Sequence, residues 1–387
     1  MDQNWLNQNN LNGLHSLKSE LMLSNNEIVD LSMINPNLSP PRIMLDKLME
    51  AETNPKNHRY SVSKGTKRLR ESFVNRYRVK FGVELCLEKQ VCVTFGTKDA
   101  VYNLLRCCSA PGELALLAGP SYPIHLAAVS LAGLKVSFFD FYQDTEELIA
   151  SLIEKIERTK PRIILLNYPN NPTGQVFQKK DWERVVEAAR KIDAVLINDF
   201  VYGELDWSNQ SKSLLASVDD ISQCVEIFSM SKAYNIPGWR VGAAIGCKKL
   251  ITKLSQLKSY LDYGLYIPIQ HAAGAGLDQG CLITKETKNI YQRRTQILNL
   301  GLEELGWETS KPKAGCSVWA KLPAIFQGLK SLDFCRELMQ KTGILLGPGV
   351  LYGEGFDTHV RFACVHNERT LQDVISTIKT FQENYSN

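Results

Sequence analysis

The sequence predicts an α/β fold, with a doubly wound large domain built on a mostly parallel seven-stranded sheet flanked by helices, and a smaller α+β domain. From about residue 90 to residue 246, short apolar runs alternate with amphipathic helical segments. Most of these runs are continuously apolar, as is typical of strands buried on both faces of a parallel sheet. Strands and helices that alternate in this way indicate a doubly wound domain.

Seven segments are predicted as strands of the large sheet. They share a near-continuous apolar character and are bounded by polar or glycine-containing turns. The predicted strands are Val91–Phe95, Leu114–Ala118, Lys135–Phe141, Ile163–Tyr168, Ala194–Phe200, Val225–Phe228 and Val241–Ile245.

The segments between these strands have the periodicity of surface helices. The helix predicted from Thr145 to Arg158 places Leu148, Leu152 and Ile156 on one face. Its acidic residues come early and its basic residues late, which suits the helix dipole. The segment Asp181–Ile192 repeats this pattern, so both helices are expected to cover the sheet.

The two ends of the chain do not follow this alternation, and we expect them to form one smaller α+β domain. The boundaries are 46–275 for the large domain, and 1–45 together with 276–387 for the small domain. The small domain is predicted to contain a long polar helix at Lys285–Leu305, strand-like segments at Ser317–Lys321, Phe334–Lys341 and Val360–Ala363, and a closing helix at Arg369–Tyr385.

Composition excludes several classes of function. The chain has 387 residues with 45 basic and 41 acidic side chains, so its net charge of +4 gives no footprint for nucleic acid. No apolar run reaches the ~20 residues that a membrane helix needs. The six histidines have no metal-ligand spacing, and no metal is expected. Ten cysteines without a CxxC pair, and a polar N-terminus unlike a signal peptide, predict a cytoplasmic protein.

The segment after the strand at Cys224–Phe228 has the residues that an imine-forming lysine requires. Ser229 and Lys232 follow the strand, and Gly238 and Arg240 come shortly afterwards. The strand fixes the amine, while the hydroxyl and the guanidinium can hold a phosphate. Gly238 has no side chain, so the backbone can come close to a bound ligand. This pattern indicates a cofactor that carries both an aldehyde and a phosphate.

Other strand ends supply complementary groups at the edge where open α/β sheets bind ligands. Gly96, Thr97 and Lys98 open a helix whose free N–H groups can hold an anion, although a simple helix cap would have the same sequence. Tyr122 lies between two prolines and can stack on a flat ring, although a packed aromatic in a rigid turn would look the same.

Two further strand ends carry polar groups that a turn does not require. Asn171 lies between prolines and can donate a hydrogen bond to a phenolate oxygen, which Tyr202 can also reach. Asp199 ends a buried strand, where a carboxylate needs a partner such as a pyridinium N–H, an arginine or a helix N-terminus. Together the strand ends match the functional groups of pyridoxal 5′-phosphate.

On these motifs the chain resembles the class I/II aminotransferases of fold type I, which depend on pyridoxal 5′-phosphate. Within that group it is most similar to bacterial glutamate–pyruvate (alanine) and aspartate-type aminotransferases. The resemblance extends from about residue 28 to residue 380. The segments that support it are His58–Ser61, Pro120–Pro123, Lys258–Gly264 and Asp357–Ala363.

The resemblance implies roles on the cofactor side of the site. Lys232 would form the Schiff base, Asp199 would pair with the ring nitrogen, and Tyr122 would stack on the ring. Asn171 and Tyr202 would bond the ring hydroxyl oxygen. The residues that would hold the phosphate are Gly96, Thr97, Lys98, Ser229 and Arg240.

The resemblance also implies a substrate clamp and a dimer. Arg361 would bind the substrate carboxylate through two parallel hydrogen bonds. Tyr60 would reach the phosphate in the neighbouring subunit, so a homodimer is expected. A dicarboxylate substrate would need a second cation, for which the sequence leaves open Lys18, Arg293 or a residue of the partner subunit.

Three positions depart from the family pattern, and all three are on the substrate side. Ile34 stands where the family usually has glycine, near the substrate carboxylate, and Ile34 and Asn171 are expected to contact the substrate together with Arg361. Leu265 stands in place of a threonine, and Leu351 in place of a small residue. These replacements predict a bulkier and more apolar substrate pocket.

The function that follows from the resemblance is amino transfer between an L-amino acid and a 2-oxo acid by a ping-pong mechanism. The three departures leave open another reaction of the same cofactor, such as β-elimination, decarboxylation or oxidation. A non-enzymatic ligand-sensing module of a regulator is a remote alternative. It is disfavoured because the residues before the sheet lack helix-turn-helix spacing and a basic face.

Overall fold

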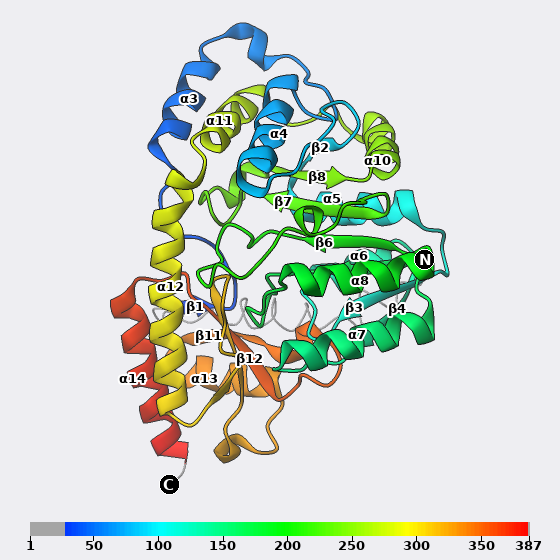
Figure 1. Cartoon of the computed structure of the whole chain (residues 1–387). Coiled ribbons are helices and arrows are strands. Elements are labelled where there is room, and N and C mark those ends of the chain that lie inside the picture. The colour runs from blue at the N-terminus through cyan, green and yellow to red at the C-terminus, as the bar shows by residue number, and fades with distance from the viewer. Residues whose placement is uncertain (1–27, 386–387) are drawn as a thin grey trace.

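The computed structural model describes residues 28–385, and two β-sheets organise that part of the chain (Figure 1). In the larger sheet, six strands are parallel to one another and β8 is antiparallel to both of its neighbours. Its strands in spatial order are β2 (Val91–Thr94), β8 (Gly242–Gly246), β7 (Cys224–Ser229), β6 (Val195–Asp199), β5 (Ile163–Leu166), β3 (Leu114–Ala118) and β4 (Lys135–Phe139). All seven predicted strands are therefore confirmed, in a mostly parallel sheet.

The smaller sheet joins the beginning of the described chain to its end. β1 pairs in parallel with β11, and the other pairs are antiparallel. The strands in spatial order are β1 (Val29–Leu31), β11 (Ile344–Pro348), β12 (His359–Ala363), β10 (Ser317–Lys321) and β9 (Glu308–Thr309). The segment around residue 30 thus lies beside strands more than 300 residues away in the sequence.

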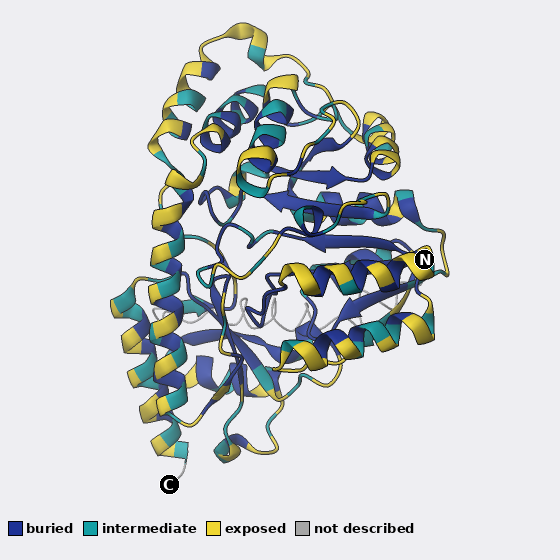
Figure 2. Ribbon diagram, viewed as in Figure 1, coloured by how far each residue is buried: buried dark blue, intermediate teal, exposed yellow. Residues whose placement is uncertain are grey.

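Helices cover both sheets, bury one face against them and expose the other (Figure 2). The helices associated with the larger sheet are α3 (Arg42–Glu52), α4 (Lys67–Phe81), α5 (Gly96–Cys108), α6 (Pro123–Leu131), α7 (Thr145–Thr159), α8 (Lys179–Lys191), α9 (Leu214–Ser217), α10 (Lys248–Leu261) and α11 (Ile267–Asp278). The long helix α12 (Cys281–Glu304) runs alongside both sheets, and α13 (Ser331–Thr342) and α14 (Glu368–Tyr385) pack beside the smaller one (Figure 1).

Local sequence explains where these helices begin and which face they bury. Asp144 caps α7 by accepting hydrogen bonds from the backbone N–H groups of Glu146 and Glu147. The predicted stripe of Leu148, Leu152 and Ile156 is buried. None of the helices between residues 28 and 385 combines the length and apolar character needed to cross a bilayer.

One predicted strand is wrong. The segment Phe334–Lys341 lies within the helix α13, and the strand of this region is β11, which follows it. Phe334, Cys335, Leu338 and Met339 are buried, a spacing that fits one face of a helix. Gly343 ends α13 in the left-handed conformation and lets the chain turn directly into β11.

The aromatic core beneath the smaller sheet gives a stability prediction. Phe334 is fully buried against the rings of Trp307, Phe326 and Phe381, at centroid distances of 5.8, 4.9 and 6.2 Å. Phe334→Ala should lower the free energy of unfolding by about 3–5 kcal/mol, because it leaves a cavity in a packed core. Urea unfolding followed by circular dichroism measures this change. Leu282→Ala, at an exposed position, is the control and should change it by less than about 0.5 kcal/mol.

Candidate active site

Lys232 lies in the turn that follows β7, and its amine is largely withdrawn from water. Its Nζ donates a hydrogen bond to the backbone carbonyl of Ile34 at 2.6 Å. Burial lowers the pKa of the Lys232 ammonium to about 8, and the positive charges of Arg361 and Arg240 act in the same direction, while Cys316 opposes them. A lysine with such a pKa offers a free amine near neutral pH, as a nucleophile or a base requires.

Asp199 is the last residue of β6 and has one carboxylate oxygen available for a ligand. The side chain is 1% exposed. Its Oδ2 lies 3.0 Å from Nε2 of His125, whereas its Oδ1 has no hydrogen-bond donor among the described residues. Since buried polar atoms in proteins nearly always have partners, Oδ1 calls for a donor that a ligand would bring. The N–H of a protonated pyridine ring fits this requirement.

The residues predicted to hold a phosphate meet at the N-terminal end of α5. Gly96, Thr97 and Lys98 are its first three residues, and Gly96 has φ +76°. A Cβ atom at Gly96 would overlap the guanidinium of Arg240, so only glycine leaves this space open. Burial, followed by the charge of Arg240, lowers the pKa of the Lys98 ammonium. Ser229, at the end of β7, completes the group.

Arg361 reaches toward the larger sheet from β12 of the smaller one. Its Nη1 donates to Oδ1 of Asn171 at 3.3 Å, and its Nη2 donates to the carbonyl of Ser32 at 2.5 Å. The guanidinium lies over the ring of Tyr352 at 5.5 Å. Its Nε is buried and has no partner among the described residues. The guanidinium therefore retains a donor for an acidic ligand.

Two tyrosines accompany these charged groups. Tyr122 precedes α6, and its ring meets that of His125 edge-on at 5.5 Å. Tyr202 is almost fully buried, and burial, followed by the nearby Cys316, raises its pKa well above 10. Its phenol therefore remains protonated at neutral pH and can donate a hydrogen bond.

The three departures from the family pattern are all buried. Ile34 is 9% exposed, and its carbonyl is the one that accepts the bond from Lys232. Leu351 packs with Trp319 and Tyr352, next to the guanidinium of Arg361. Leu265 is buried where its carbonyl accepts a bond from Gln270, so it contributes to the fold in this subunit.

Some predicted residues lie apart from this group. Tyr60 is 83% exposed, and its ring lies 4.5 Å from that of Tyr263, which is also exposed. The side chain of Arg293 is 58% exposed and pairs with Glu368 at 3.5 Å. Lys18 lies outside the described residues. No cluster of three potential metal-binding side chains occurs between residues 28 and 385.

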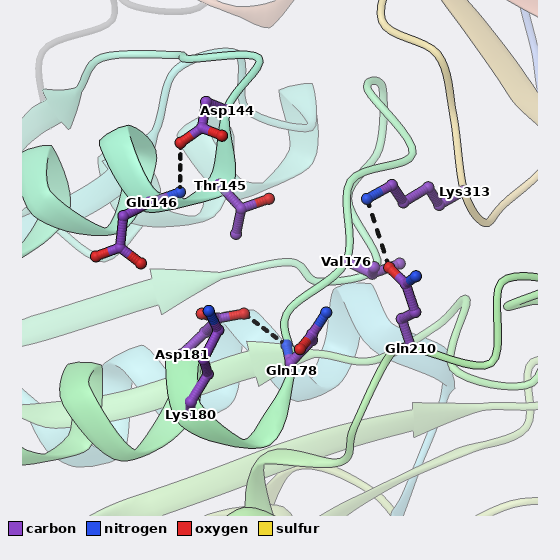
Figure 3. A pocket seen from close by; sticks show the side chains of 9 residues that line it. All are labelled: Asp144, Thr145, Glu146, Val176, Gln178, Lys180, Asp181, Gln210 and Lys313. Carbon is purple, nitrogen blue, oxygen red and sulfur yellow. Dashed lines mark hydrogen bonds between the residues drawn. The ribbon is translucent and has the colours of Figure 1, made fainter.

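A separate polar hollow opens beside the N-terminal ends of α7 and α8 (Figure 3). Its wall includes Asp144 and Asp181, whose carboxylates accept the backbone N–H groups of Glu146 and Gln178. Lys313 reaches over it from the loop before β10. None of the predicted site residues lines this hollow, and its acidic groups already serve as helix caps, so no chemistry is assigned to it.

Sequence reasoning missed three groups that support the site. His125 contacts Asp199, and the side-chain amide of Asn167 donates to the Asp199 carbonyl at 2.5 Å. Asn167 also accepts a hydrogen bond from the backbone N–H of Asn171. The backbone carbonyl of Ser32 accepts a hydrogen bond from the guanidinium of Arg361. A signal was available for His125, which follows Tyr122 by three residues at the start of the same helix.

Comparison with known proteins is consistent with this arrangement. Residues 26–378 match the family model Aminotransferase class I and II. The chain is 36% identical to AatC of Rhizobium meliloti (95% of this chain, 91% of AatC) and 34% identical to the glutamate-pyruvate aminotransferase AlaC of Escherichia coli (91% and 86%). The substrate-bound BacF structure from Bacillus subtilis superimposes with a TM-score of 0.87 at 30% identity (95% and 94%).

The lowered pKa of Lys232 leads to a pH prediction. In protein stripped of bound small molecules, reductive methylation of Lys232 with formaldehyde and cyanoborohydride should rise with pH and show a midpoint near 8, because the free amine is the reacting form. Mass spectrometry of the peptide that contains Lys232 measures the extent of labelling. A midpoint near 10.5, the ordinary value for lysine, would contradict the burial of this amine.

Proposed function

The chain belongs to the class I and II aminotransferases, and from this we propose that Lys232, Asp199 and Arg361 are the principal residues of its active site. It is a fold type I, pyridoxal 5′-phosphate-dependent enzyme that moves an amino group between an L-amino acid and a 2-oxo acid. The observation that carries the residue assignment is the buried Oδ1 of Asp199, which finds no donor in the described part of the chain, in a site that also holds an amine of lowered pKa.

The roles of Lys232 and Asp199 follow from their surroundings. Bound pyridoxal 5′-phosphate supplies an aldehyde that takes up the amino group and a ring that accepts an electron pair. The neutral Nζ of Lys232 would take the proton from the substrate α-carbon and deliver it to the cofactor carbon that carried the aldehyde, and would move a proton the opposite way in the second half-reaction. Asp199 Oδ1 accepts the N–H of the ring nitrogen and keeps that nitrogen protonated, while His125 fixes the other carboxylate oxygen.

The remaining cofactor contacts are assigned by the same reasoning. Asn171 and Tyr202 bond the ring hydroxyl oxygen, and Tyr122 stacks on the ring. The N-terminal end of α5 attracts the phosphate with its N–H groups and its dipole. The residues proposed to hold the phosphate are Gly96, Thr97, Lys98, Ser229 and Arg240.

Arg361 is proposed to bind the carboxylate that all substrates share. Its buried Nε has no partner within residues 28–385, and its Nη2 can turn from the Ser32 carbonyl to a carboxylate oxygen, which gives two parallel charge-assisted bonds. The side chains of Ile34 and Leu351 make the remaining wall apolar. This supports amino acids with compact or apolar side chains as the favoured donors.

The active unit is proposed to be a homodimer. Large apolar or aromatic side chains are exposed together in two adjoining segments, a group that we call the aromatic surface: Tyr60, Val62, Tyr260, Leu261 and Tyr263. Exposed apolar clusters of this kind mark association sites. Association through the aromatic surface would let Tyr60 reach the phosphate site of the partner subunit.

The chain is also proposed to fold as two domains and to reside in the cytoplasm. The large domain is assigned residues 46–275 and the small domain 1–45 and 276–387, of which 1–27 and 386–387 lie outside the described residues. The separate sheets support this division, because β1 and β9 to β12 form the smaller sheet and β2 to β8 the larger one (Figure 1). The cytoplasm is proposed as the location because all ten cysteines are free thiols.

A donor screen tests the function. The loaded protein is mixed with single amino acids, and the cofactor spectrum and released products are measured. Amino transfer should convert the cofactor to its amine form and release one equivalent of 2-oxo acid. Lys232→Ala should abolish this conversion, and Lys135→Ala, at an exposed position on β4, should retain it. Release of ammonia and pyruvate without conversion would instead indicate β-elimination.

The proposed binding of the substrate carboxylate by Arg361 gives a second prediction. Arg361→Lys should lower kcat/KM for amino acids about 10- to 100-fold, mainly by raising KM, because a lysine cannot make two parallel bonds to a carboxylate. Steady-state kinetics with the best donor of the screen measures the change. Arg293→Lys makes the same substitution at an exposed position and should leave kcat/KM unchanged. Equal losses in both variants would contradict the role of Arg361.

A further inference from the structure

A buried lysine on α10 lies between two carboxylates and has no place in the reaction. The side chain of Lys258 is 0% exposed. Its Nζ donates to Oδ2 of Asp99 at 3.1 Å and to Oδ2 of Asp262 at 2.7 Å, and it lies 5.0 Å from the centre of the Phe95 ring. We call these three charged residues the α10 triad. The side chains of Asp99 and Asp262 are 21% and 20% exposed, and desolvating charges to this extent is costly, so the triad calls for an explanation beyond stability.

One arm of the triad, Asp99 with its hydrogen bonds, contacts the backbone beside the phosphate site. Asp99 lies in the first turn of α5, and its Oδ2 also accepts the backbone N–H of Phe95 at 3.0 Å. Its Oδ1 accepts the amide of Asn103 at 2.6 Å. Phe95 directly precedes Gly96, and its carbonyl receives a bond from Arg240 at 3.2 Å. Asp99 therefore fixes the backbone from which the phosphate-binding residues extend.

The other arm, Asp262 with its hydrogen bonds, contacts the backbone that carries the aromatic surface. Oδ1 of Asp262 accepts the backbone N–H of Gly264 at 2.7 Å, and its carbonyl accepts the hydroxyl of Ser63 at 2.8 Å. Tyr263 lies between Asp262 and Gly264, and Ser63 follows Tyr60 by three residues. A Cβ at Gly264 would collide with the carbonyl of Val62, so the two segments are closely packed.

Among the described residues, Lys258 joins the two arms directly. Its Nζ donates to Oδ2 of both carboxylates, and each carboxylate also accepts a backbone N–H from a loop, that of Phe95 on one side and that of Gly264 on the other. A displacement of either loop therefore strains an ion pair whose lysine is fully buried, where water has little access to replace the lost contact.

We propose that the α10 triad couples cofactor binding to subunit association, with Lys258 as the positioning residue that links the phosphate site to the aromatic surface. The inference rests on the proposed cofactor site and homodimer. Phosphate binding orders the start of α5, and through Asp99, Lys258 and Asp262 it holds Tyr263 and Tyr60 in the arrangement that the partner subunit contacts. By linkage, association strengthens cofactor binding by the same factor.

The test measures coupling rather than activity. The dimer dissociation constant is determined by sedimentation velocity over a dilution series, with and without pyridoxal 5′-phosphate, for the wild type and for Lys258→Met. In the wild type the cofactor should tighten the dimer about tenfold, within the usual range of coupling between sites. In Lys258→Met this factor should fall clearly below the wild-type value, leaving only the coupling that a direct contact of Tyr60 with the partner's phosphate site supplies. Lys80→Met removes a lysine from the buried Glu204 ion cluster and should keep the wild-type factor.

A second variant keeps the test informative if Lys258→Met fails to fold. Asp262→Asn removes one charge and retains the Oδ1 acceptor for Gly264, and its coupling factor should also fall. The inference is overturned if either folded variant keeps the wild-type factor, or if a wild-type dimer that binds the cofactor shows no dependence on it. A wild type that binds the cofactor and remains monomeric overturns the homodimer as well, whereas failure to bind the cofactor overturns the proposed function itself.

Discussion

The burial of charge at the carboxyl edge of the larger sheet is the constraint on which this site depends. Asp199 is held at the end of a buried strand with one oxygen lacking a donor, and Lys232 and Arg361 are confined nearby with little access to water. Such burial costs several kcal/mol for each ion unless opposite charges and hydrogen bonds compensate. A ligand with a protonated ring nitrogen and an aldehyde would compensate Asp199 and Lys232, and the carboxylate of a substrate would compensate Arg361.

The site is completed only where the two sheets meet. Arg361 comes from the smaller sheet, yet its hydrogen bonds go to Asn171, which follows β5, and to Ser32, which follows β1. Ile34 continues the same segment and receives the amine of Lys232. The backbone between β1 and α3 therefore accepts one hydrogen bond from each of these cations. In the proposed role of Arg361, a substrate carboxylate would replace the Ser32 carbonyl, and this segment would then take part in substrate selection.

Sequence reasoning located the strands and most of the candidate residues because buried parallel strands are continuously apolar and their carboxyl ends share one edge. It does not find contacts between elements that are distant in the sequence, such as that of His125 on α6 with Asp199 on β6. The strand predicted at Phe334–Lys341 is wrong because eight residues show too little periodicity to separate a strand from a helix. The burial of Lys258 is not predicted, because it arises from the packing of α10 against α5.

The measurement that tests the account most directly is the ¹⁵N chemical shift of the ring nitrogen in bound, isotope-labelled pyridoxal 5′-phosphate. If Asp199 Oδ1 accepts the ring N–H, the wild-type enzyme should show the shift of a protonated pyridine at and above neutral pH, and Asp199→Asn should show that of an unprotonated one. An unprotonated ring in the wild type, or the same shift in both proteins, would contradict the pairing.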